Sequence, residues 1–140
     1  MEFESVKKFL GIHHRGVVTT TQKNSAAHDS IVVCGHHQDK MLFVSVMGNS
    51  RKVHNLRRNP RCTVLGVSDD WGQYVVVEGQ ATLMDYRNTD AEEYRVHLRD
   101  AFRACGGGEH SDWGEYDFAM RKQDAVMVLV SPDNVYGRIR

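Results

Sequence analysis

The sequence lacks an excess of either charge, because its 18 lysines and arginines are balanced by 18 aspartates and glutamates. A balanced chain creates no long-range field toward nucleic acid or an acidic membrane surface. It also lacks a hydrophobic run near the roughly 20 residues that a membrane span requires, and residues 1–10 contain no signal-peptide core. We therefore expect no nucleic-acid partner and no membrane association.

Cysteine is also scarce: Cys34, Cys62 and Cys105 are odd in number, widely spaced and free of any CxxC motif. Such usage argues against a disulfide framework and favours a reducing, cytoplasmic setting. The three thiols are expected to be small, buried hydrophobic groups. Two pairs of adjacent histidines, at 13–14 and 36–37, predict no metal site, because neighbouring residues on a strand point to opposite faces.

Motifs of dinucleotide binding and of acid–base catalysis are absent as well. No GxGxxG occurs, and the strand-like segments do not alternate with crossover helices, which excludes a Rossmann sheet. No Ser-His-Asp or Cys-His arrangement and no paired carboxylate motif is visible. We therefore assign no catalytic residue and no metal ligand.

What the sequence does contain is a series of short strand patterns within one domain, residues 1–140. Strands are expected at 16–22, 29–35, 41–47, 61–67, 73–84 and 125–130, with a last edge strand at 135–137 after a turn at 131–134. Helices are expected at 5–10, 51–59, 88–104 and 112–121.

Hairpins join most of these strands, and a loop at 36–40 is expected between the second and the third. Gly79 lies in the middle of the long strand at 73–84, where it predicts a bulge or a sharp bend. The sequence thus predicts a mainly β fold, a six- to seven-stranded antiparallel barrel with short helices.

The most distinctive segment is 47–60, where a strand leads through Gly48 and Asn49 into a basic helix. A helix N-terminus attracts anions, because its first N–H groups lack partners and the helix dipole is positive there. We interpret this segment as a phosphate site. Ser50 offers a hydroxyl and a backbone N–H, Arg51 a fork-shaped donor and Lys52 a point charge.

Several segments carry a wider resemblance: FL at 9–10, GVVTT at 16–20, LFVSVM at 42–47 followed by SRKVHNLRRNP at 50–60, Trp71 ahead of YVVVEGQA at 74–81, GEHSDW at 108–113, Met120, and VYG at 135–137. Their order resembles the pyridoxamine 5′-phosphate oxidase-like, or flavin reductase-like, split β-barrel family. The similarity is closest to the branch that uses the deazaflavin coenzyme F420.

This resemblance implies a split β-barrel that forms a homodimer with two cofactor sites along the interface. The phosphate-bearing tail would lie near the helix start and the ring along two strands, while the hairpin of the partner chain closes the site. The implied cofactor-binding residues are Ser30, Ile31, Val32, Ser45, Val46, Met47, Asn49, Ser50, Arg51, Lys52, Trp71 and Tyr74.

The implied activity is that of an F420-dependent oxidoreductase, which transfers hydride between the deazaflavin and a small conjugated organic substrate. FMN is the alternative cofactor, because Ser50 stands where the family often has an arginine and its branches differ there, although Lys52 matches the family lysine. A non-catalytic cofactor- or haem-binding protein is a further alternative, since the chain has 8 histidines. Of these, His28 lies beside the expected ring-binding strand.

Overall fold

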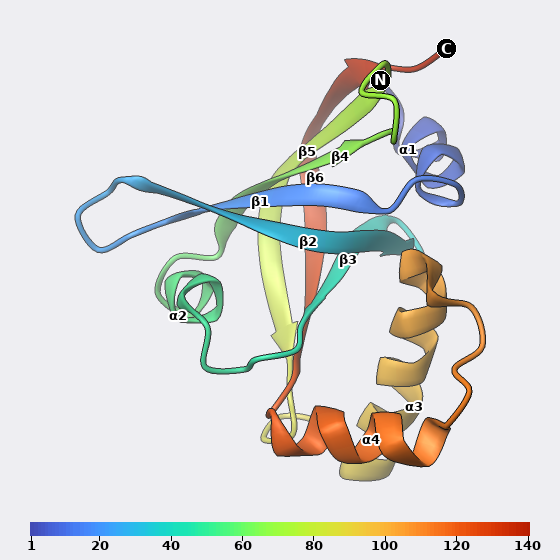
Figure 1. The fold of residues 1–140 in the computed structure, drawn as a ribbon. Coiled ribbons are helices and arrows are strands. Elements are labelled where there is room, and N and C mark those ends of the chain that lie inside the picture. The colour runs from blue at the N-terminus through green and yellow to red at the C-terminus, as the bar shows by residue number, and fades with distance from the viewer.

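The computed structural model describes residues 1–140, and Figure 1 shows its helices and strands. The strands are β1 (Arg15–Thr21), β2 (Ala27–His37), β3 (Lys40–Ser45), β4 (Arg61–Val67), β5 (Tyr74–Met84) and β6 (Val126–Arg138). The helices are α1 (Phe3–Leu10), α2 (Arg51–Arg58), α3 (Ala91–Phe102) and α4 (Trp113–Lys122), and a π-helical segment, η1 (Arg103–Gly107), continues α3. No helix combines the length and the apolar character needed to cross a membrane.

The strands close into a barrel in the order β1-β2-β3-β6-β5-β4, and all neighbouring strands are antiparallel. The mainly β, antiparallel barrel with short helices is thus confirmed. Side chains that alternate along the strands fill its interior and meet α1 and α2 in one apolar core. Cys34 and Cys62 are buried in this core, as expected, whereas Cys105, in η1, is only partly buried.

The expected turn at 131–134 and the separate edge strand at 135–137 are wrong, because β6 is one strand of 13 residues paired with β5 along its length. The register shifts between Glu78, which pairs with Asn134, and Gly79, which pairs with Pro132. Asp133 is therefore the extra residue of a bulge, and proline, which cannot donate to a ladder, is tolerated there. The bend that Gly79 predicts is confirmed, and the barrel has six strands.

The expected loop at 36–40 is also wrong, because β2 and β3 continue until His37 pairs with Lys40. Only Gln38 and Asp39 remain to form the turn, and Gln38 takes a positive φ of 53°. The backbone pairing of β2 with β3 therefore extends into residues 36, 37 and 40, although their side chains are polar. No group of three or more His, Cys, Asp or Glu side chains in the structure is placed to hold a metal ion.

A second apolar cluster forms where α3 and α4 pack beside the lower half of the barrel (Figure 1). Tyr94 on α3 connects this cluster to the barrel. Its hydroxyl lies 2.8 Å from the carbonyl oxygen of Met84 and 2.7 Å from that of Ala125, and it accepts the N–H of Met127 at 3.0 Å. One buried side chain thereby holds α3 against the end of β5 and the start of β6.

Candidate functional site

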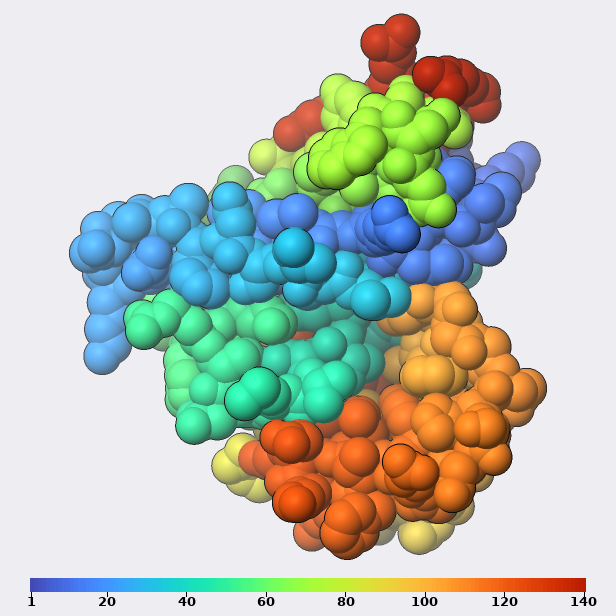
Figure 2. Space-filling model, in the orientation of Figure 1, coloured from blue at the N-terminus to red at the C-terminus, as the bar shows by residue number.

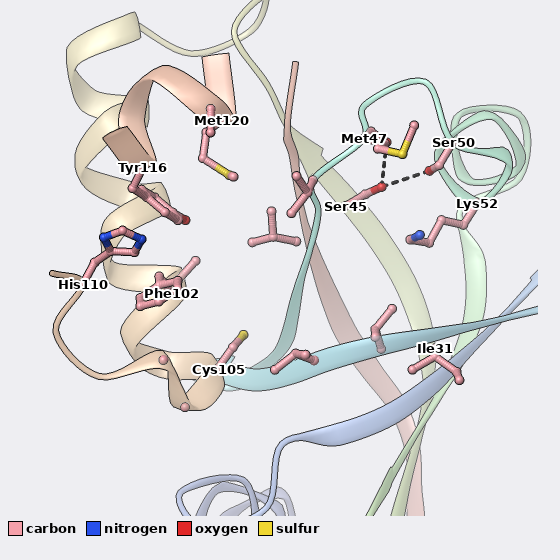
Figure 3. A pocket seen from close by; sticks show the side chains of 18 of the residues that line it. Ile31, Ser45, Met47, Ser50, Lys52, Phe102, Cys105, His110, Tyr116 and Met120 are labelled. Carbon is pink, nitrogen blue, oxygen red and sulfur yellow. Dashed lines mark hydrogen bonds between the residues drawn. The ribbon is translucent and has the colours of Figure 1, made fainter. Parts of the chain in front are cut away.

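A cavity of about 780 Å³ lies between the barrel and the α3–α4 pair, and Figure 3 shows it from close by. The barrel wall includes Ile31 and Val33, which point outward from β2, and the facing wall includes Phe102, Tyr116 and Met120. Of its 19 lining residues, 12 are hydrophobic, so the walls are apolar. Volume and lining are typical of a site for an organic ligand of cofactor size.

The end of the cavity beside α2 is polar, and Ser50 organises it as the N-cap of the helix. Its Oγ accepts the N–H of Val53 at 3.4 Å. The hydroxyl of Ser45 donates to the carbonyl oxygen of Met47 at 2.9 Å, so the Ser50 hydroxyl, 2.9 Å from Ser45 Oγ, is the donor of that second bond (Figure 3). The N–H of Ser50 also donates to Met47. Both donors of Ser50 are therefore used inside the chain, and its role here is to position the helix start.

The free donors at this end belong to Lys52. Its backbone N–H has no acceptor in the chain, because a helix leaves its first N–H groups unpaired. The Lys52 side chain is half-buried at the cavity and forms no ion pair, and burial lowers the pKa of its ammonium below the ordinary value. An unpaired, partly buried ammonium beside an apolar cavity indicates a site for an anionic group.

Gly48 places the loop between β3 and α2 directly against the turn between α4 and β6. Its N–H donates to the carbonyl oxygen of Gln123 at 3.0 Å. A Cβ atom at this position would lie 1.8 Å from the carbonyl oxygen of Asp124, so no side chain fits. The close approach sets the distance between the polar end of the cavity and α4.

Aromatic side chains form the helical wall of the cavity, and no sequence motif indicates them as site residues. The rings of Phe102 and Tyr116 lie 5.1 Å apart, and Trp113 lies 5.4 Å from Tyr116, in edge-to-face arrangements. The Tyr116 hydroxyl donates to the carbonyl oxygen of Leu98 at 2.9 Å, which fixes its ring. The spacing of Tyr116 and Met120 along α4 is a sequence signal for an apolar helix face, but only the tertiary structure shows that this face lines the cavity.

His110 is the only imidazole that lines the cavity, and its hydrogen bond identifies its tautomer. Its Nδ1 accepts the backbone N–H of Asp112 at 2.9 Å. The neutral ring therefore carries its proton on Nε2. A histidine that binds a metal usually donates through its other ring nitrogen, so this arrangement favours a hydrogen-bond donor over a metal ligand.

The predicted contacts that line this cavity are Ile31, Val32, Ser45, Val46, Met47, Ser50 and Lys52. Ser30 lies outside it, with its hydroxyl 3.5 Å from Nδ1 of His28. Asn49 and Arg51 line a separate polar cavity on the other side of α2.

Trp71 and Tyr74 lie in and after the β4–β5 turn, at the end of the barrel remote from α4 (Figure 1). Trp71 is 81% exposed and takes a positive φ of 64°. One chain does not bring these two residues to the cavity, so their contact with a cofactor stays a prediction that requires a second chain.

Comparison with known proteins places this architecture in a family. The family model described as pyridoxamine 5′-phosphate oxidase matches residues 3–138. The chain belongs to the pyridoxamine 5′-phosphate oxidase family. The match spans the whole barrel together with α2, α3 and α4, so both walls of the cavity lie within the family's domain.

Solved structures share the fold of this pyridoxamine 5′-phosphate oxidase family member. The conserved hypothetical protein Rv2991 from Mycobacterium tuberculosis has a TM-score of 0.76 at 17% identity, over 98% of this chain and 84% of that one. A structure named F420 reductase has a TM-score of 0.66 at 14% identity, over 93% and 94%. HutZ, the heme storage protein from Vibrio cholerae, has a TM-score of 0.69 at 15% identity, over 97% and 94%. At these identities the likeness establishes the fold alone.

Proposed function

We propose that this chain is an F420-binding oxidoreductase that transfers hydride between the deazaflavin and a small conjugated organic substrate. One observation carries the proposal: the unpaired ammonium of Lys52 stands at the polar end of a largely apolar cavity of about 780 Å³. A flat heterocycle with a phosphate-bearing tail has the same distribution of polarity. Membership of a family with flavin-type cofactors supports this assignment, as does the structural neighbour named F420 reductase.

The phosphate would be held at the start of α2. The ammonium of Lys52 supplies a charge-assisted hydrogen bond, and the free backbone N–H of Lys52 adds a directed donor. Ser50 contributes indirectly, because its three hydrogen bonds keep this first turn in place.

The ring would lie between the outer face of β2 and the helical wall. Ile31 and Val33 offer an apolar floor, and Phe102 and Met120 stand opposite. The bound cofactor supplies the hydride chemistry. The residues of the chain orient the ring and exclude water from it.

Two of the titratable side chains in this wall, Cys105 and Tyr116, stay neutral. Burial raises the pKa of the Cys105 thiol to about 12 and that of the Tyr116 phenol to about 12. At neutral pH Cys105 is therefore no nucleophile, and Tyr116 has its proton engaged with Leu98. This supports a site that binds and orients a redox cofactor without a catalytic residue of its own.

A homodimer is part of the proposal, because the open side of the cavity is apolar and exposed. Ile31 is 87% exposed, Val33 59% and Met47 63%. A partner chain that covers this strip would remove it from water and bring its own hairpin toward the ring.

Haem is the competing ligand, since a haem storage protein shares the fold and His110 lines the cavity. To bind iron through Nε2, however, His110 would have to move its proton to Nδ1 and give up the hydrogen bond from Asp112. That cost favours a phosphate-bearing cofactor over haem.

Titration of the purified protein with F420, followed by the quenching of F420 fluorescence, tests the proposal. We expect low-micromolar or tighter binding, weakened about tenfold or more in Lys52→Met, because a charge-assisted hydrogen bond is lost. Lys122→Met, which removes an exposed lysine at the end of α4, is the matched control and should bind normally. Stoichiometric FMN without any F420 binding would replace F420 by FMN, and a Soret band that depends on His110 would replace both by haem.

A further inference from the structure

A second cavity, of about 480 Å³, lies between the β1–β2 hairpin and α2. Figure 1 shows the hairpin extending beyond the barrel above α2, and Figure 2 shows its blue tip and the green helix on one face of the molecule. None of the 8 residues that line this cavity is hydrophobic. It is therefore a site for a polar ligand, unlike the main cavity.

The lining of this second cavity is cationic. Lys23, Arg51 and Arg58 contribute permanent positive charges, His54 adds a titratable group, and no carboxylate is present. None of the three permanent cations takes part in an ion pair anywhere in the structure. Because the chain as a whole is neutral, this is a local and uncompensated excess of positive charge.

Two asparagines of the lining, Asn24 and Asn49, use their side-chain oxygens as acceptors within the chain and keep their NH2 donors free. The side-chain oxygen of Asn24 accepts the N–H of Ala26 at 3.0 Å. That of Asn49 lies 2.8 Å from Nε2 of His54, and because an amide oxygen only accepts, His54 is the donor. The NH2 groups of Asn24 and Asn49 form no bond in the chain. The side-chain groups of Asn24 and Asn49 that are free to contact a ligand are therefore N–H donors, which suit an acceptor-rich ligand.

The floor of this cavity is built by buried hydrogen bonds. Asn55 is 3% exposed, and its NH2 group donates to Oγ1 of Thr20 at 3.0 Å while its oxygen accepts from Arg58 at 3.2 Å. Arg58 also donates to the carbonyl oxygen of Thr21. These bonds join α2 to the end of β1 and hold the guanidinium in place, which reduces the entropy lost when a ligand binds.

We propose that this second cavity is a binding site for an oxyanion, a phosphate or a carboxylate group. Lys23, Arg51 and Arg58 supply the charge, and the amides of Asn24 and Asn49 supply directed hydrogen bonds.

The proposed oxyanion site is separate from the anion site at Lys52 in the main cavity. Along the helix start, Asn49 and Arg51 line the second cavity, whereas Ser50 and Lys52 line the main one. Successive residues of the segment therefore serve opposite sides of α2. The oxyanion site does not depend on what the main cavity binds.

Inorganic phosphate and citrate are suitable probes, titrated at constant ionic strength into ¹⁵N-labelled Lys52→Met protein, in which the other anion site is weakened. We expect saturable shifts of the side-chain NH2 signals of Asn24 and Asn49. Lys23→Gln in this background should weaken the response about tenfold, through the loss of one charge-assisted bond. Lys122→Gln, an exposed lysine outside both cavities, should leave it unchanged. A stronger response to phosphate assigns a phosphate-bearing ligand, and a stronger response to citrate a carboxylate.

Two results would overturn the inference. If Lys52→Met abolishes the shifts seen in the unmodified protein, anions bind only in the main cavity. If Lys23→Gln and Lys122→Gln weaken the response equally, the effect comes from net charge rather than from a site.

Discussion

The guanidinium of Arg57 lies 2.9 Å from a carboxylate oxygen of Asp85, and this pair joins the last turn of α2 to the end of β5. Asp85 is 3% exposed, and its other oxygen accepts the N–H groups of Arg87 and Asn88, each at 2.9 Å. The first turn of α2 is held separately, by the bond between Ser50 and Ser45. The position of the polar end of the cavity therefore depends on anchors at both ends of one short helix.

Asp85→Asn should lower the free energy of unfolding by about 1–3 kcal/mol at neutral pH. Burial raises the pKa of Asp85, but the hydrogen bonds from Arg57, Arg87 and Asn88 outweigh it, so the pKa lies below the ordinary value. A depressed carboxyl pKa stabilises the fold above the pKa of the unfolded chain, and this contribution is lost as the pH falls through the folded value. Urea unfolding at neutral and acidic pH measures both effects.

The control for Asp85→Asn is Asp133→Asn, an exposed carboxylate at the bulge of β6. It should leave the free energy of unfolding unchanged. Equal loss of stability in the two variants, or an unaltered acid dependence in Asp85→Asn, would contradict a stabilising role for the pair with Arg57.

Anion binding at Lys52 should depend on pH in the alkaline range. Burial lowers the pKa of the free ammonium, and a bound anion raises it again. Below the pKa that Lys52 has in the free protein, its ammonium is protonated both in the free and in the anion-bound protein, and the affinity for the anion is maximal. Between the free and the bound values binding takes up a proton, so affinity falls with rising pH. Calorimetry in buffers of different ionisation enthalpy measures this uptake, which should vanish in Lys52→Met.

Gly48→Ala should weaken cofactor binding about tenfold and destabilise the fold by about 1–3 kcal/mol, because the loop must move away from the carbonyl oxygen of Asp124. The matched control is Gly114→Ala in α4, where the nearest contact of the new Cβ would be an ordinary 3.5 Å. Fluorescence titration and urea unfolding of both variants measure the effects. Normal affinity in Gly48→Ala would show that the loop tolerates displacement.

The neutral ring of His110 should carry its proton on Nε2, because its Nδ1 accepts the N–H of Asp112. The ¹⁵N chemical shifts of its ring at a pH where it is neutral report the tautomer directly. Addition of haem should leave those shifts unchanged, because the ring does not bind iron in this state. A protonated Nδ1 would remove the argument against haem.

Local sequence patterns are sufficient to predict most of the helices and strands of the fold. Strand alternation at 61–67 matches β4 to the residue, and the basic helix expected from residue 51 is α2, which begins at Arg51. These signals depend on neighbours along the chain, so they can be read without tertiary information. Residues 131–134 are the counterexample: proline and asparagine there indicate a turn, but pairing with β5 across the bulge at Gly79 makes them part of β6.

The candidate site likewise has one part that the sequence predicts and one part that it does not. Lys52 follows from a strand that leads into a basic helix and Met47 from the family resemblance, and both line the cavity. The opposite wall, with Phe102, His110 and Tyr116, does not follow, because its approach to β2 results from contacts between segments far apart in the sequence.

By itself, the sequence determined an antiparallel barrel and a helix start suited to anions. The barrel follows from the short-range periodicity of the strands and their hairpins, and the helix start follows from the residues around position 50. Only the tertiary structure decided which donors at that start are free: it engages the donors of Ser50 within the chain and leaves Lys52 unpaired. The reason is physical. Whether a polar group is available to a ligand depends on which partners the fold brings within hydrogen-bonding distance, and those partners come from distant parts of the chain.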